Sequence, residues 1–205
     1  MSHSNEATKK GGMFTPEFVK ELLNLVAVLV AITVVVAGLL GLINAVTKDR
    51  IEELKEQKIV QAMNEIIPDA SDFSKLDTAD IEGTAVTEVY EAKDSSGAFK
   101  GWCMKTLTSG FGGDVVAMVG VSPEGQVMKV VLTSLSETPG LGMKAKNDSF
   151  ISQYDGKSGT IGVVKVNPGE SDIVAISGAT ITSKAVTAGV QAALDVAARL
   201  GGAAK

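Results

Sequence analysis

The stretch AISGATITSKAVTAGVQAALDVAARL, residues 175–200, joins a glycine-containing turn to an alanine-rich segment. Apolar residues in its second part recur at helical spacing, which predicts an amphipathic helix from about Thr182 to Leu200 that packs on a core. The apolar face includes Val186, Val190, Leu194 and Ala197. Several hydroxyl residues crowd the start of this helix, although one or two would be enough to begin it. They are Ser177, Thr180, Thr182 and Ser183.

This hydroxyl surplus has two interpretations. Hydroxyls at the start of a helix commonly cap it by accepting bonds from free backbone N–H groups, and Thr180 or Thr182 would serve. That interpretation leaves the small residues Ser177-Gly178-Ala179 unexplained, whereas a bulky ligand would need the space that they clear. The free N–H groups and the positive end of the helix dipole also suit a phosphate. From spacing alone, a helix cap and a phosphate site are equally supported.

Upstream of this helix the sequence is typical of β-strands. The runs TEVYEAKD and FKGWCMKTLT are separated by a turn containing SSG, and DVVAMVGV and QVMKVVLTSL flank SPEG, so we expect two hairpins. The preceding segment, SDFSKLDTADIEGTA, is rich in turn residues, and we expect it to be an irregular entry to the domain. Strands grouped together with helices at their edges indicate an α+β domain, which we place at residues 69–205.

Two loops of this strand-rich region are rich in glycine. TSGFGGDV, residues 108–115, surrounds Phe111 with glycines, which let a backbone approach a ligand closely. In SETPGLGMK, residues 136–144, Pro139 and Gly140 fit the two central positions of a type II turn. The second loop would present N–H groups and apolar side chains to a flat ring. Taken singly, the loops could equally be a flexible turn and a rigid corner.

The segment LLNLVAVLVAITVVVAGLLGLINAVT, residues 22–47, contains no charged residue. Its uninterrupted apolar part, Leu25 to Ile43, would be about 28 Å long as a helix, which matches the hydrocarbon core of a bilayer. A buried core helix would show a polar face, and a cleaved signal peptide would have a shorter apolar region ending in a small-x-small site. The segment has neither feature, so the sequence predicts an uncleaved transmembrane helix.

Charged segments flank this span on both sides. The leader, residues 1–21, and the segment that follows the span both carry lysines, so the positive-inside rule does not decide the orientation. In KDRIEELKEQKIVQAMNEIIPDA the apolar residues recur at helical spacing, which predicts a stalk helix over residues 48–68 with Pro68 as its stop.

The composition excludes several classes of function. The net charge is −5, so the chain lacks the basic footprint of a nucleic-acid partner. The single cysteine, Cys103, excludes an internal disulfide, a Cys-rich zinc site and an iron–sulfur cluster held by this chain, and we expect it to be a small core residue. The single histidine, His3, lies in the polar leader, so a Ser-His-Asp or Cys-His mechanism has no base. We therefore expect no catalytic side chain and no metal site, and any chemistry would come from a cofactor.

The motifs SETPGLG, SGATITS and GFGG together resemble the FMN-binding domain found in the G subunit of the bacterial Rnf electron-transport complex. The same domain family includes the C subunit of the sodium-pumping NADH:quinone oxidoreductase. The resemblance covers most of the chain, because the order of anchor, stalk, strand-rich middle and final Ser-Gly-Ala-Thr is the same. Two positions depart from the family pattern. Val174 replaces an acidic residue, with Asp172 nearby, and Leu135 replaces a histidine.

The resemblance implies a covalent FMN. A separate flavin transferase would join the flavin through its phosphate to Thr180, and Ser177, Thr182 or Ser183 would bond the phosphate or cap the helix. The other implied cofactor-binding residues are Gly178 and Ala179 beside Thr180, and Glu137, Thr138, Gly140, Leu141 and Gly142 near the isoalloxazine ring.

The resemblance also implies the role and the surroundings of the chain. It would be a single-pass inner-membrane protein in contact with membrane lipid, with its C-terminal domain outside the cytoplasm. It would transfer electrons among the membrane and redox subunits of an ion-translocating ferredoxin:NAD oxidoreductase. The alternatives are the C subunit of the quinone reductase, which the short chain disfavours, and a membrane-tethered binding domain without a redox group.

Overall fold

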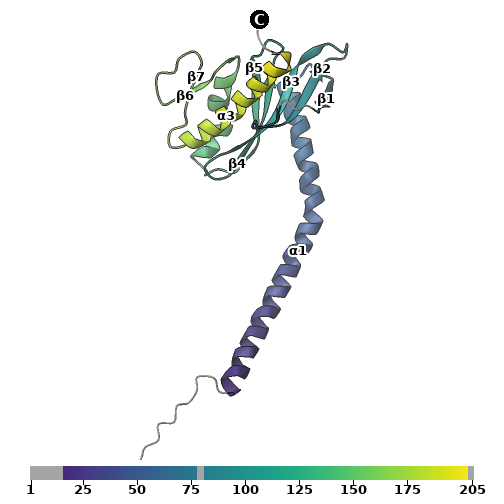
Figure 1. Ribbon diagram of the computed structural model, residues 1–205, viewed down its shortest axis with the longest axis vertical. Helices are drawn as coiled ribbons and strands as arrows, with labels where there is room; N and C mark the ends of the chain where they lie inside the picture. Colours follow the sequence, from purple (N-terminus) through teal and green to yellow (C-terminus); the bar gives the residue numbers. More distant parts are fainter. Residues whose placement is uncertain (1–15, 78–80, 203–205) are drawn as a thin grey trace, which may run out of the picture. The chain divides into compact units, whose positions relative to one another are not determined.

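The computed structural model describes residues 16–77 and 81–202, and the chain forms two compact units, residues 1–54 and 55–205 (Figure 1). Most of the predicted leader, including His3, lies outside the described residues.

Helix α1, Pro16–Ile66, contains both the predicted transmembrane segment and the predicted stalk as one continuous helix. By length and composition the helix can cross a membrane, and its most apolar stretch is not buried inside the protein. Every described side chain between residues 16 and 54 is exposed. The helix ends at Ile66, two residues before Pro68, as expected because a proline disfavours helical geometry in the residue before it.

The second unit contains a five-stranded antiparallel sheet in which each strand pairs with the next along the chain, in the order β1-β2-β3-β4-β5. The strands are β1 Asp72–Leu76, β2 Val86–Lys93, β3 Phe99–Ser109, β4 Asp114–Val121 and β5 Val127–Leu135. Both predicted hairpins, β2–β3 and β4–β5, are confirmed. The expectation of an irregular entry before residue 86 is wrong in part, because β1 forms there by pairing with β2.

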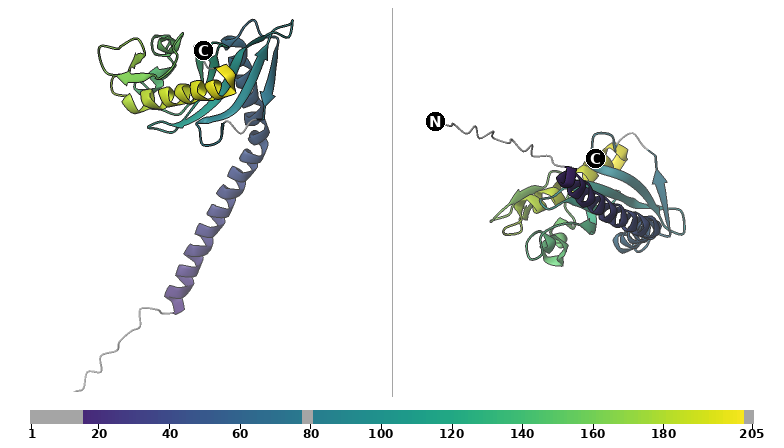
Figure 2. Two further views of the ribbon diagram at one scale, coloured as in Figure 1. Left: turned by 45° about the horizontal axis from the view of Figure 1, so that its top comes forward. Right: turned by 90° about the horizontal axis from the view of Figure 1, so that it is seen from below.

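The two faces of the sheet are covered by different helices. Helix α3, Thr180–Ala197, packs on one face and begins two residues earlier than predicted; it continues into a short π-helical turn, Ala198–Gly202. Figure 2, left, shows α3 lying across the sheet. The last turns of α1 cover the other face, where Met63 and Ile66 contact a cluster that contains Cys103. Successive strand residues point to opposite faces, so Cys103 faces α1 while Met104 faces α3. The chain therefore has the predicted α+β fold.

Cys103 is fully buried, and burial raises the pKa of its thiol to about 12. The thiol is therefore a small core group, as expected.

Short elements connect β5 to α3. They are η2 Gly142–Lys146, α2 Asp148–Ile151, η3 Ser152–Tyr154, β6 Gly162–Val164 and β7 Asp172–Val174. Side-chain bonds hold this connection against α3: the hydroxyls of Tyr154 and Thr187 are 2.8 Å apart, and the Gln191 side chain accepts a bond from the Ile161 N–H. The connection therefore leads the chain back to the first turn of α3, where the hydroxyl cluster lies.

Candidate functional site

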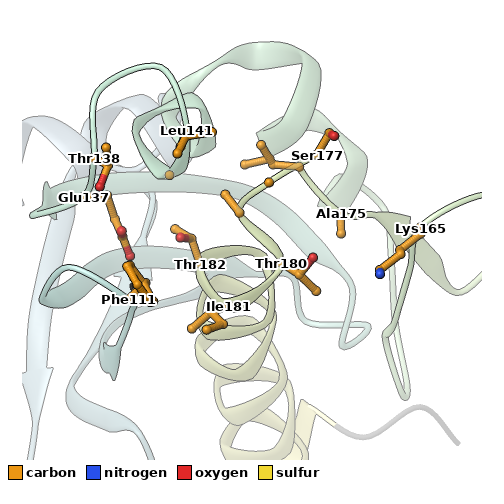
Figure 3. Close-up of a pocket in the computed structure, with 14 residues that line it drawn as sticks. Phe111, Glu137, Thr138, Leu141, Lys165, Ala175, Ser177, Thr180, Ile181 and Thr182 are labelled. Atoms are coloured by element: carbon orange, nitrogen blue, oxygen red, sulfur yellow. Dashed lines mark hydrogen bonds between the residues drawn. The ribbon is translucent and has the colours of Figure 1, made fainter.

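The three glycine-containing loops that the sequence singled out meet at one cavity of about 520 Å³ beside the first turn of α3 (Figure 3). The first loop contributes Phe111, the second contributes Glu137, Thr138, Leu141 and Gly142, and the third contributes the continuous segment 175–182. This volume lies within the range of small-molecule sites. Of the predicted cofactor-binding residues, all except Gly140 line the cavity; Ser183, the alternative partner of the phosphate, does not.

The start of α3 is organised by Ser183 rather than by a capping side chain. The N-cap residue is Ala179, and it makes no side-chain cap bond. The buried Ser183 hydroxyl accepts a bond from the Ile176 N–H at 2.9 Å and donates to the Ala179 carbonyl at 3.0 Å. These bonds tie the Ser-Gly-Ala turn to the helix, so the capping interpretation of Thr180 and Thr182 is wrong.

Thr180 and Thr182 differ in access to the cavity. Thr180 is the first residue of α3 and is half-buried, whereas Thr182 is buried. Within the described part of the chain, neither hydroxyl has a hydrogen-bond partner. Figure 3 shows the Thr180 hydroxyl on the side of Lys165 and Ala175, and the Thr182 hydroxyl on the side of Glu137. The Thr180 hydroxyl is thus the more accessible of the two.

Gly178 adopts a backbone conformation that favours glycine. Its φ is +78°, in the left-handed region, and an added Cβ would lie 3.0 Å from the Leu141 side chain. The small residue expected from the sequence is therefore required by the turn and by the neighbouring loop.

Glu137 joins the first two loops. Its Oε1 accepts a bond from the Phe111 N–H at 2.7 Å, and its Oε2 accepts one from the Gly112 N–H at 3.1 Å. Gly142 lies so close to this carboxylate that an added Cβ would be 2.8 Å from the Glu137 Cβ, from its Oε2 and from the Thr182 Oγ1. Gly142 is therefore needed for close packing and not only for flexibility.

The turn before Gly142 has the predicted form. The Leu141 N–H donates to the Thr138 carbonyl at 3.2 Å, and Gly140, at the third position, has a φ of +78°. A positive φ at that position is the mark of a type II turn. Gly140 therefore shapes the loop without lining the cavity.

Lys165 is the one described lining residue that lies outside the three loops singled out from the sequence. The strands β6 and β7 are parallel, with Val164 opposite Val174, so the next residues, Lys165 and Ala175, emerge at the same end. Lys165 is the one cationic side chain among the described residues that line the cavity. Within the described residues it has no ion-pair partner. No local motif around Lys165 indicates this position, because only the pairing of two short strands creates it.

The chemistry of the cavity fits a flat aromatic ring that carries a phosphate. The side chains of Phe111, Leu141 and Ile181 are apolar and exposed, and all three line the cavity. The first turn of α3 has N–H groups without intrahelical partners, and Thr180 and Lys165 add a hydroxyl and a positive charge. FMN has a phosphate and an aromatic ring system, so the residues present fit this cofactor.

Two family models match the chain: the FMN-binding domain over residues 110–195 and the RnfG N-terminal region over residues 20–66. The chain is 37% identical over 192 residues to the G subunit of the Na⁺-translocating ferredoxin:NAD⁺ oxidoreductase complex of Acetobacterium woodii, covering 86% of this chain and 92% of the relative. It is 35% identical over 144 residues to the G subunit of the proton-translocating ferredoxin:NAD⁺ oxidoreductase complex of Clostridium ljungdahlii, covering 68% of this chain and 74% of the relative.

Among solved structures, the chain is similar to the C subunit of the Na⁺-translocating NADH-quinone reductase of Parabacteroides distasonis. The TM-score is 0.55 at 18% identity, over 75% of this chain and 94% of the other. At this identity the likeness supports the fold alone.

Proposed function

The chain belongs to the RnfG family of ion-translocating ferredoxin:NAD oxidoreductase complexes, and from this premise we propose that it carries electrons within such a complex on an FMN esterified to Thr180. The single observation that carries the proposal is the convergence of three loops on one cavity that has an accessible, unpartnered Thr180 hydroxyl at the start of a helix.

The residues divide by their place in the cavity. Thr180 would supply the esterified oxygen, and Ser177 and the first turn of α3 would bind the phosphate, whose negative charge Lys165 would balance. Gly178 and Ala179 line the same end of the cavity and, as small residues, would leave space for the phosphate. On the ring side, the lining is formed by Phe111, Glu137, Thr138, Leu141, Gly142, Ile181 and the buried Thr182.

Attachment would form a bond between the Thr180 Oγ and the phosphorus of the flavin phosphate, and would break the bond from that phosphorus to the leaving group of an activated flavin donor, which would depart with the Thr180 hydroxyl proton. We assign that transfer to a separate flavin transferase, because Glu137 is the one carboxylate among the described lining residues and both of its oxygens already accept N–H bonds. When bound, FMN supplies redox chemistry by accepting and releasing electrons. The side chains of the cavity would then hold and orient the ring, a task that requires no catalytic base.

In this proposal α1 is a single-pass anchor in membrane lipid, and the FMN-binding domain lies outside the cytoplasm beside the other membrane and redox subunits of the complex. The apolar, exposed part of α1 supports the anchor. The orientation can be tested by placing a cysteine at the exposed Ser95 and labelling intact cells with a membrane-impermeant maleimide. Cys103 is fully buried and provides no background. Labelling of Ser95→Cys only after cell lysis would contradict the proposed orientation.

The main proposal is tested by expressing the full chain with and without a flavin transferase. With the transferase, we expect flavin fluorescence to migrate with the denatured polypeptide, and the intact mass to rise by one FMN less one water. Peptide mapping should place the added mass on the peptide that contains Thr180. A colourless chain from a host whose transferase modifies a known substrate would overturn the proposal.

A further inference from the structure

Phe111 is 70% exposed although it lines the cavity. Two other lining residues also expose large apolar side chains: Ile181 by 52% and Leu141 by 44%. Single exposed apolar residues are common, but these three line one cavity, and their side chains are left exposed by the described part of the protein. A flat ring tethered at Thr180 would cover apolar surface of this lining.

The loop that carries Phe111 is held by two hydrogen bonds to Glu137 and by one hydrogen bond of its own. The carboxylate of Glu137 accepts the N–H of Phe111 itself and the N–H of Gly112, and the Gly110 N–H donates to the Gly113 carbonyl at 2.9 Å. Figure 3 shows Glu137 directed toward Phe111 from the opposite loop. Two bonds from adjacent amides to one carboxylate determine where the backbone of Phe111 lies, and so where its ring can reach.

The glycines of the first loop fit this arrangement. An added Cβ at Gly110 would clash with the Glu137 Oε1, and one at Gly112 would lie 2.7 Å from the Ser136 carbonyl oxygen. The GFGG motif thus allows a carboxylate to approach the loop closely while the loop still presents one aromatic side chain.

We propose that Phe111 stacks against the isoalloxazine ring and that Glu137 is the positioning residue that holds Phe111 there by binding two backbone amides. This inference rests on the proposed function, because it takes the tethered flavin as the occupant of the cavity. It gives Glu137 a role through the loop rather than through direct contact with the flavin.

Stacking is tested by the constant with which dissolved iodide quenches the flavin fluorescence of the flavinylated full chain, because a side chain stacked on the ring shields one of its faces from solvent. The variants are Phe111→Ala, Phe111→Tyr and, as a matched control, Val166→Ala, which alters a 72% exposed apolar residue outside the cavity lining. We expect Phe111→Ala to raise the unstacked population, and with it the iodide quenching constant, by about twofold. Phe111→Tyr should lower the yield without iodide, because a stacked phenol, unlike a phenyl ring, quenches excited flavin by electron transfer; Val166→Ala should match wild type. An unchanged iodide quenching constant in Phe111→Ala would overturn the stacking role.

The positioning role is tested first without flavin, by hydrogen exchange on the unmodified full chain in detergent micelles. Glu137→Gln keeps the shape of the side chain but replaces one acceptor oxygen by an NH₂ group. We expect the amides of residues 111 and 112 to exchange about tenfold faster or more. The bond between Ile176 and Ser183 provides an internal control, because its exchange should not change. Unchanged exchange at residues 111 and 112 would overturn the positioning role.

A double variant separates action through Phe111 from direct action on the flavin. We expect the single variant Glu137→Gln to raise the iodide quenching constant of the flavin, and the same change to add nothing in the Phe111→Ala background, because residues that act in series are not additive. A further rise in the double variant would overturn the positioning role. A wild-type chain that takes up no flavin would overturn the proposed function itself, whereas a flavinylated wild type with an unaffected Phe111→Ala would overturn this inference alone.

Discussion

The second compact unit of the chain, residues 55–205, holds the carboxylates of Glu88 and Glu137 in two different ways. Glu88, on the sheet, is bound by side chains. Lys105 donates to its Oε1 at 2.8 Å and Tyr90 donates to its Oε2. The Nζ of Lys75 lies 3.4 Å from the same Oε2. Glu137, at the cavity, is bound by two backbone amides. We call the first group, Lys75, Glu88, Tyr90 and Lys105, the sheet cluster.

The partners decide what each carboxylate does. Partial burial disfavours the charge of Glu88, but the hydrogen bonds from Lys105 and Tyr90 and the nearby lysine charges outweigh it and lower the pKa of Glu88 to about 2. Burial and the Glu88 carboxylate raise the pKa of Tyr90. Side-chain partners thus link three strands, whereas the backbone partners of Glu137 shape a loop. We therefore expect changes in the sheet cluster to alter stability, and changes at the cavity to alter the cofactor.

The largest expected effect is at the cavity. Thr180→Val removes the hydroxyl and nearly preserves the shape of the side chain, so covalent flavin should be abolished in the chain co-expressed with a flavin transferase. Thr182→Val is the matched control and should retain the flavin, because Thr182 is a buried residue whose hydroxyl lies on the side of Glu137. The intact mass and the flavin fluorescence of the denatured polypeptide measure the covalent flavin in both variants. A Thr180→Val chain that still carries the label would show that the attachment site is elsewhere.

A steric change at the cavity should affect both the stability of the protein and the attachment of flavin. In Gly142→Ala the new Cβ would meet Glu137 and Thr182 at 2.8 Å, so we expect the free energy of unfolding to fall by about 1–3 kcal/mol and flavin attachment to decrease. Gly140→Ala is the control in the same loop: its Cβ would enter open space, and the positive φ alone would destabilise the turn. It should therefore retain flavin attachment. Denaturant unfolding and intact mass distinguish the two, and equal flavin loss in both variants would argue against the steric explanation.

The sheet cluster should affect stability and its pH dependence. Glu88→Gln should lower the free energy of unfolding by about 1 kcal/mol at neutral pH, because the pair is only partly buried, and should leave flavin attachment unchanged. Glu88 has a folded-state pKa below its ordinary value of 4.5, so its contribution is complete above pH 4.5 and disappears as the pH falls toward about 2.

Denaturant unfolding of wild type and Glu88→Gln across this pH range measures the effect. Glu91→Gln is the control, because the carboxylate of Glu91 pairs with Lys93 of its own strand. A difference between wild type and Glu88→Gln that stays constant from neutral pH to about pH 2 would contradict the assignment.

The smallest expected effect is at Lys165. Its side chain is exposed, so its attraction for a phosphate is screened by solvent and salt. We expect Lys165→Met to slow flavin attachment by about twofold at low salt and less at high salt. Lys157→Met, outside the cavity lining, is the control. A salt-independent change, or an equal change in the control, would exclude a role for the Lys165 charge.

Local patterns account for what could be predicted. The apolar helix, both hairpins and the final helix follow from the spacing of side chains along the chain, which reflects how helices and strands present their faces. The strand β1 was missed because Phe73 and Leu76, its apolar residues, do not alternate; it forms through pairing with β2. The strands β6 and β7 have three residues each, too few to show a pattern in the sequence, and they too form through pairing with each other.

The candidate site likewise has features that local sequence indicates and features that depend on tertiary contacts. Local turn and helix-start chemistry singled out the three loops that line the cavity, and the resemblance to the FMN-binding family implied Thr180 and Glu137 as site residues within them. They did not indicate that Glu137 binds the amide of Phe111, a residue 26 positions away, or that Lys165 would emerge beside Ala175. Those contacts depend on which strands and loops become neighbours.

By itself, the sequence determined an apolar helix long enough to span a bilayer, an α+β domain and three loops with unusual backbone freedom, because each of these depends on residues close together in the chain. Only the tertiary structure decided that the three loops share one cavity, which hydroxyl is accessible there and which carboxylate binds the loop that carries an aromatic ring. Such contacts form only when the sheet and α3 pack together and bring distant segments within hydrogen-bonding distance.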